Sequence, residues 1–186
     1  VIDPIDIIDQ FGADTARWFV MSDSPPDRDI SWSTEGVEGA WRHLNRVWRL
    51  TKEIARKFEQ NDTKETLRED RKVDDLVFDT SSFIESFSFN KAIAKIYELT
   101  NFLAGKDANI DQKIYGIKAL AILMEPFTPH LAQEIWYEIG QEGLIAEAPW
   151  PDIKKRMTRE EDQIILPIQI NGKRKTEIAV APDITE

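Results

Sequence analysis

The chain has 186 residues, no cysteine and a formal net charge of −10, with 41% hydrophobic and 31% charged residues. This length and composition favour one soluble helical domain with a small appendage. Without cysteine, disulfides and thiolate metal sites are excluded within these residues, and the protein is expected in the cytoplasm.

No apolar run approaches the roughly 20 residues that a membrane helix needs, so no membrane contact is predicted. The first residues lack a basic leader and a starting Met, from which we expect no signal peptide and a piece of a longer chain. An acidic chain is a poor general ligand for nucleic acid, because phosphate binding needs a basic surface. Any contact with RNA must therefore come from a local basic segment.

Two short helices are predicted at the start of the chain. Asp3 is a typical N-cap, and Pro4 suits the first helical position. Gly12 should end the first helix, and the second should run as far as Pro25-Pro26, which cannot continue a helix.

The segment from 34 to 59 shows the clearest helical periodicity, with Ser33 or Thr34 as its cap. Its predicted apolar face consists of Leu44, Val47, Trp48, Thr51, Ile54, Ala55 and Phe58. Its opposite face, an arc of about 80° at 100° per residue, carries Arg42, Arg46, Arg49 and Arg56. From 37 to 58, six basic and two acidic residues give +4. This excess is the best physical sign of a polyanion contact.

A polar linker at 60–70 should separate this helix from a helical region at about 67–104. The apolar positions of that region are Val73, Leu76, Val77, Phe83, Ile84 and Phe87. The stretch 86–90 should interrupt it, with Asn90 capping the second half and Gly105 following its end.

Two further helices complete the predicted bundle. One runs from about Asp111 to Met124. The next is started by Thr128, as a hydroxyl cap before Pro129, and closes at Gly140. The fold class is therefore mainly α, a helical bundle. The chain ends in two β-rich runs joined by Asn171-Gly172, which predict a C-terminal β-hairpin.

No active site is predicted within the chain. His43 and His130 are far apart and lack zinc-ligand spacing, and we interpret His130 as a structural residue. No glycine-rich phosphate loop, nucleophile elbow or HExxH motif occurs. We therefore expect no catalytic residue, no metal site and no bound cofactor.

A series of motifs, in the correct order along nearly the whole chain, resembles the leucyl branch of the class I aminoacyl-tRNA synthetases. The stretch 11–17 (FGADTAR) resembles the element that follows the second catalytic signature of that class. The other matching elements are 24–26 (SPP), 29–33 (DISWS), 36–40 (GVEGA), 41–49 (WRHLNRVWR), 89–94 (FNKAIA), 123–130 (LMEPFTPH), 134–136 (EIW), 150–151 (WP) and 169–173 (QINGK). Residues 60–82 match no motif of the family.

The resemblance implies a leucyl-tRNA synthetase divided here into three parts. Residues 1–32 would be a stem-contact-like connection from the catalytic domain, 33–152 an anticodon-binding-type bundle, and 153–186 a linker and hairpin that begin the C-terminal domain. The whole enzyme would use ATP and Mg²⁺ to attach leucine to tRNA(Leu), and its partners here would be that tRNA and the catalytic, editing and C-terminal domains. The HIGH and KMSKS signatures are missing, so the chain alone is expected to be inactive. We expect a monomer.

The predicted tRNA-binding residues are Arg42, Arg46, Arg49, Arg56, Arg17, Lys173 and Arg174. Guanidinium groups one helical turn apart suit phosphates, and we predict backbone contacts without base readout. The alternatives are a solvated helix face for the first four, a packing role for Arg17 and a solubilising strand edge for the last two. Trp41 and Trp48 flank the apolar face, which favours packing over base stacking. Trp32 is also expected to pack on the bundle.

Two other functions compete with this interpretation. The first is the same domain of a valyl, isoleucyl or methionyl enzyme, against which the motifs at 24–40 and the terminal hairpin argue. The second is a stand-alone helical module that binds a protein through its acidic surface. A starting Met and a complete C-terminal boundary would favour that module.

Overall fold

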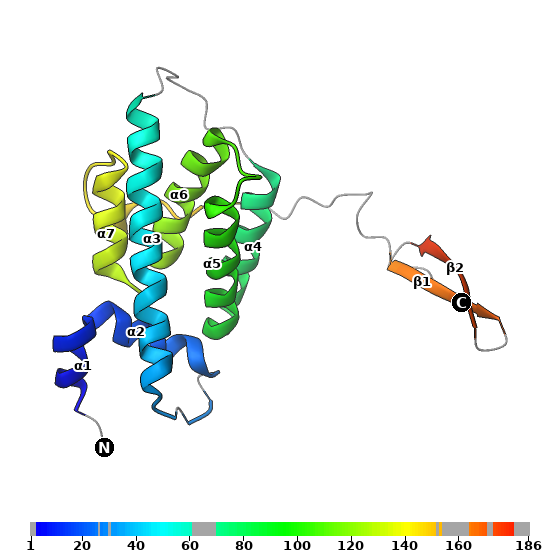
Figure 1. Ribbon diagram of the computed structural model, residues 1–186, viewed down its shortest axis with the longest axis horizontal. Coiled ribbons are helices and arrows are strands. Elements are labelled where there is room, and N and C mark those ends of the chain that lie inside the picture. The colour runs from blue at the N-terminus through cyan, green and yellow to red at the C-terminus, as the bar shows by residue number, and fades with distance from the viewer. Residues whose placement is uncertain are drawn as a thin grey trace. The chain divides into compact units, whose positions relative to one another are not determined.

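The computed structural model describes residues 3–25, 27–29, 31–60, 70–151, 153, 164–170 and 173–180. The chain divides into two compact units, Val1–Ile153 and Lys154–Glu186. The described residues of the first unit contain seven α-helices and a short 3₁₀ turn, so the mainly helical prediction is confirmed (Figure 1).

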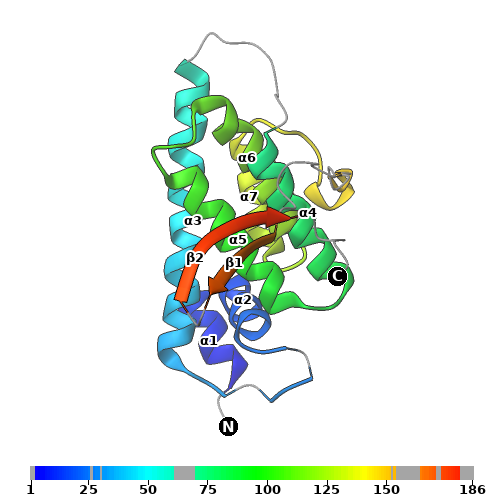
Figure 2. The ribbon, with the colours of Figure 1, turned by 90° about the vertical axis from the view of Figure 1, so that its right-hand side faces the viewer.

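Helices α1 (Pro4–Phe11) and α2 (Ala13–Asp23) form the predicted pair at the start of the chain. The N–H of Ile5 donates to Asp3 Oδ1 over 2.9 Å, which confirms the cap. Gly12 separates the helices with φ at +85°, a conformation that glycine adopts without steric cost. Both helices lie at the end of the bundle where α3 begins (Figures 1 and 2).

Helix α3 (Thr34–Gln60) is amphipathic as predicted. The N–H of Gly36 donates to Ser33 Oγ over 3.1 Å, so the serine caps the helix. The predicted apolar face is buried or half-buried except at Phe58, which is exposed. At Gly36, an added Cβ would lie 2.7 Å from the Phe19 ring, so glycine lets α2 and α3 approach closely.

The centre of the bundle is α6 (Ile110–Met124), which packs against α3, α4 (Arg71–Glu85), α5 (Phe89–Ala104) and α7 (Pro129–Glu138). Every residue from Ala119 to Met124 is buried, and a helix that is apolar all round belongs inside a protein. The turn η1 (Ile145–Glu147) packs on α6 and α7. Because α3 packs on α6 and α7 through its apolar face, its opposite face, which carries Arg42, Arg46, Arg49 and Arg56, lies on the surface. This is the outward face of α3.

The corner between α4 and α5 differs from the prediction. Ser88, not Asn90, is the N-cap residue of α5. The N–H of Ser88 donates to Phe83 O over 2.8 Å and that of Phe87 to Ile84 O over 3.0 Å, a Schellman arrangement. Phe87 adopts the left-handed conformation, with φ at +54°, and is 66% exposed. Its predicted place in the apolar face is therefore wrong, because the turn directs it outward.

The second unit contains the strands β1 (Ile164–Ile170) and β2 (Lys173–Val180). They pair antiparallel, with Ile164 opposite Val180 and Ile170 opposite Lys173. The register shifts between Ile168 and Gln169. The predicted turn at 171–172 lies outside the described residues.

Asp14 joins α2 to the start of α7, 117 positions further along the chain. Its Oδ2 accepts a hydrogen bond from the N–H of Leu131 over 2.8 Å. The predicted cap of that helix, Thr128, instead donates its hydroxyl to Met124 O over 3.2 Å. Thr128 is the N-cap residue as predicted, but its hydroxyl makes no cap bond, because a carboxylate from another helix satisfies the N–H group that the threonine would have bonded.

His43 joins three helices through ring contacts. Its ring is stacked on Trp18 of α2 at 5.2 Å between centroids and lies 3.8 Å from Tyr97 of α5. The residue is buried, and its Nε2 atom has no hydrogen-bond partner among the residues that the structure describes. Burial, aided by the charge of Arg46, lowers the pKa of His43 to about 4. The imidazole is therefore neutral in the folded protein at neutral pH.

Protonation of His43 should make stability depend on pH. Its pKa is lower in the folded chain than the ordinary 6.5, so the unfolded chain binds the proton first. The free energy of unfolding should thus fall as pH drops from 6.5 towards 4. His43→Phe keeps a stacked ring without a titratable group. In urea denaturation, its stability relative to the parent should rise as the pH is lowered from about 7 to about 5. Parallel curves for the two proteins would contradict this.

Removing the Asp14 carboxylate should destabilise the first unit. Asp14→Ala leaves the Leu131 N–H without its acceptor, a loss of roughly 1–3 kcal/mol. Asp14→Asn keeps an acceptor oxygen and should lose less. The matched control is Asp9→Ala on an exposed position of α1, where a change within about 0.5 kcal/mol is expected. Denaturation midpoints provide the measurement, and equal midpoints for the two alanine variants would rule out this role.

Candidate nucleic-acid interface

The outward face of α3 presents all four predicted arginines to solvent. Arg42 Nη1 lies 3.4 Å from Glu38 Oε2 in an exposed ion pair, and Arg46 Nη1 donates to Asn101 Oδ1 over 2.7 Å. Arg49 and Arg56 have no ion pair or hydrogen bond with any of the described residues. The alternative was that neighbouring carboxylates pair with these arginines. Among the described residues, such a pair occurs at Arg42 and at none of the other three.

Beside these arginines, one flank of α3 is attached to α7. Lys52 Nζ lies 2.8 Å from Glu138 Oε2 and 5.1 Å from the centre of the Trp48 ring. Trp48 is half-buried against the core, as predicted, whereas Trp41 is 44% exposed. The expected packing of Trp41 at the core or its rim stays a prediction, because more than half of the residue is covered although it lies outside the fully buried core.

A second polar cluster lies where α2 meets α7. Arg17 Nη1 and His130 Nδ1 lie 2.9 Å and 3.2 Å from the same oxygen of Asp14. Arg17 pairs with Asp14 one turn earlier on α2 and is exposed, and its contact with tRNA stays a prediction. His130 Nδ1 contacts the Asp14 carboxylate, but its side chain is 71% exposed, more than that of a core histidine would be. The Trp32 and Phe19 rings form a T-shaped pair with 5.2 Å between their centroids, so Trp32 packs as predicted.

The remaining predicted contacts, Lys173 and Arg174, are at the start of β2. Their side chains lie outside the part of the chain that the structure describes. Their contact with RNA stays a prediction.

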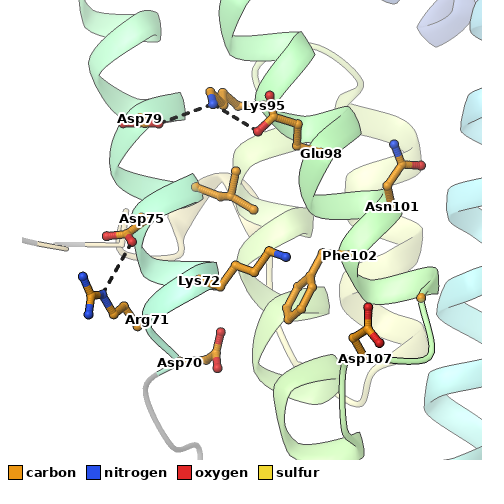
Figure 3. Close-up of a pocket in the computed structure, with 12 residues that line it drawn as sticks. Asp70, Arg71, Lys72, Asp75, Asp79, Lys95, Glu98, Asn101, Phe102 and Asp107 are labelled. Atoms are coloured by element: carbon orange, nitrogen blue, oxygen red, sulfur yellow. Dashed lines mark hydrogen bonds and ion pairs between the residues drawn. The ribbon is translucent and has the colours of Figure 1, made fainter. Parts of the chain in front are cut away.

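A groove of about 880 Å³ separates parts of α4 and α5 (Figure 3). Its charged lining consists of Asp70, Asp75, Asp79, Glu98 and Asp107 against Arg71, Lys72 and Lys95. Lys95 lies between two carboxylates, 3.0 Å from Glu98 and 3.6 Å from Asp79, and the hydrogen bond to Glu98 raises its pKa. An excess of carboxylates repels phosphate, so this groove is a poor surface for RNA.

Sequence reasoning missed two residues that shape these surfaces. Asn101 bonds Arg46 from α5 and also lines the groove, but a single exposed amide in a helix has no distinguishing pattern. Asp14 lies within the FGADTAR motif, but the motif does not show which group Asp14 bonds.

Among the described residues, no three potential metal ligands gather in one place. No described helix is both long and apolar enough to cross a membrane.

Comparison with known proteins gives consistent matches over this chain. A leucine–tRNA ligase of Cereibacter sphaeroides (strain ATCC 17025 / ATH 2.4.3) is 50% identical over 184 residues, covering 99% of the chain and 21% of the relative. One of Ruegeria pomeroyi is 50% identical over 189 residues, covering 99% and 22%. The chain thus spans about a fifth of the length of these relatives.

A solved structure and a family model extend these matches. The crystal structure of the LeuRS–tRNA–LeuAMS ternary complex of Agrobacterium radiobacter K84 matches all of this chain and 25% of that chain, with a TM-score of 0.77 and 29% identity. The model of the anticodon-binding domain of tRNA ligase matches residues 70–186. The chain belongs to the family of anticodon-binding domains of tRNA ligases.

Proposed function

We propose that this chain is the tRNA-binding segment of a leucine–tRNA ligase and that α3 contacts the RNA backbone. The names of its relatives and the tRNA in the matched ternary complex support this function. They also favour the leucyl branch over the valyl, isoleucyl and methionyl alternatives. The observation that carries the physical proposal is the outward face of α3, where Arg49 and Arg56 have no partner among the described residues.

The proposed role of the chain is to position the RNA without reading base identity. Guanidinium groups bind phosphate oxygens through paired N–H donors, and such contacts set register without reading sequence. Arg42 and Arg46 could join Arg49 and Arg56 by exchanging their present partners, which are a half-exposed carboxylate and an amide. Three or four phosphates would then be held along one helix.

The rest of the proposal concerns the whole protein. It would attach leucine to tRNA(Leu) with ATP and Mg²⁺ as a cytoplasmic monomer, using catalytic and editing domains outside this chain. Residues 1–32 would connect the catalytic domain to the bundle at 33–152, and the strands of 153–186 would form a hairpin that begins the C-terminal domain. No chemical step is assigned to the residues of this chain.

Salt dependence tests the proposed backbone contact. Three or four phosphate contacts should give the chain a log–log slope of about −3 for binding to tRNA(Leu), measured in a fluorescence titration at several salt concentrations. Arg49→Ala and Arg56→Ala should each reduce the size of the slope by roughly 0.7–0.9.

The matched control is Arg71→Ala, which removes an exposed arginine from the acidic groove between α4 and α5. It changes the net charge equally but should leave the slope as in the parent chain. Binding without salt dependence would refute the proposal. So would an equal reduction of the slope by all three substitutions, since that would indicate net charge alone.

A further inference from the structure

Trp41 differs from the other five tryptophans of the chain in the contacts of its ring. Five have a ring or hydrogen-bond contact: Trp18 with His43, Trp32 with Phe19, Trp48 with Lys52, Trp136 with Lys118, and Trp150 with Ser81. The indole of Trp41 has no such contact with any described residue, and 44% of the residue is exposed. A partly exposed aromatic ring that makes no such contact is free to receive a binding partner.

The surroundings of Trp41 on α3 are polar and of mixed charge, because Glu38 lies one turn before it and forms an exposed ion pair with Arg42. Trp41 directly precedes Arg42, and Asn45 Nδ2 donates to the Trp41 carbonyl oxygen over 2.9 Å one turn later. Arg49 follows one further turn along the same side. Within one turn on α3, no other apolar side chain is exposed. A protein partner generally covers several apolar groups together, so this isolated ring beside arginines fits a nucleic acid better.

We infer that Trp41 is a stacking platform for an unpaired base of the RNA whose phosphates the arginines of α3 hold. The inference rests on the proposed function and adds a contact of another kind to it. Every base has a π face, so stacking tolerates any sequence, and it is consistent with a surface that reads no base identity. The flat indole would fix the position of one nucleotide, while the neighbouring guanidinium groups hold its backbone.

Stacking and phosphate contacts differ in their dependence on salt. A neutral ring releases no counterions, so its loss weakens binding equally at every salt concentration and leaves the log–log slope unchanged. Loss of an arginine reduces the slope itself. The two contributions on α3 can therefore be separated in one titration series.

The experiment uses the full-length protein that carries this chain and measures the Kd for tRNA(Leu) at several salt concentrations. Trp41→Ala should raise Kd by about 5- to 100-fold with no change in slope, the range for loss of one stacked base. Trp41→Phe keeps an aromatic face and should lose less. The matched control is Trp150→Ala, which removes a ring that is 40% exposed elsewhere on the first unit and should leave Kd unchanged.

Two results would overturn the inference in distinguishable ways. If Trp41→Ala binds like Trp150→Ala while Arg49→Ala reduces the slope, the stacking contact fails and the proposed function stands. If neither Trp41→Ala nor Arg49→Ala alters binding, both fail.

Fluorine NMR distinguishes RNA from a protein partner. In 5-fluorotryptophan-labelled full-length protein, the Trp41 resonance is assigned by its disappearance in Trp41→Phe. The expected result is a solvent isotope shift without RNA and a changed resonance when tRNA(Leu) is added. A resonance without an isotope shift in the RNA-free protein would show that another part of the protein covers Trp41, and the inference would be wrong.

Discussion

The bundle depends on the burial of α6 by the helices around it. Each fully buried aliphatic side chain contributes roughly 1.5–3 kcal/mol, and the last six residues of α6 are all buried. Gly116 lets Leu103 of α5 pack directly against the α6 backbone, where any larger residue would collide with it. Because α3 packs on α6 through one face only, its other face is left outside. The position of the arginines is therefore a consequence of core packing.

Charge is separated over the surface of this acidic protein. The groove between α4 and α5 concentrates carboxylates, whereas α3 has an excess of cations. Such a separation limits general attraction to polyanions and leaves one helix able to bind phosphate. Arg46 links the two regions through Asn101, a residue that also lines the groove. A phosphate on α3 would therefore compete with an amide for Arg46, and with a carboxylate for Arg42.

Two junctions, at Asp14 and His43, attach α2 to the rest of the bundle. Asp14 provides the acceptor at the start of α7, and His43 packs between rings of α2 and α5. The Asp14 carboxylate accepts hydrogen bonds from Arg17 and from the N–H of Leu131, whereas the His43 imidazole leaves Nε2 without a hydrogen-bond partner among the described residues. Burial of the Asp14 carboxylate is therefore compensated by hydrogen bonds. Burial of the His43 imidazole instead lowers the stability of the fold, and this cost grows when the ring is protonated. These junctions make α2 part of the same compact unit as the bundle.

The sequence alone determined the features that depend on neighbouring residues in the chain. The Asp3 and Ser33 caps, the bounds of α3 and α6 to within a residue or two, and the outward arginine face follow from local periodicity and capping. The ordered motifs indicated the family, and the family model confirms it. Tertiary structure alone decided which distant groups meet. Asp14 replaces Thr128 as the hydrogen-bond acceptor at α7, His43 is neutral, and Trp41 stays partly exposed. Each outcome depends on which helix packs alongside the residue. Helical periodicity does not contain that information.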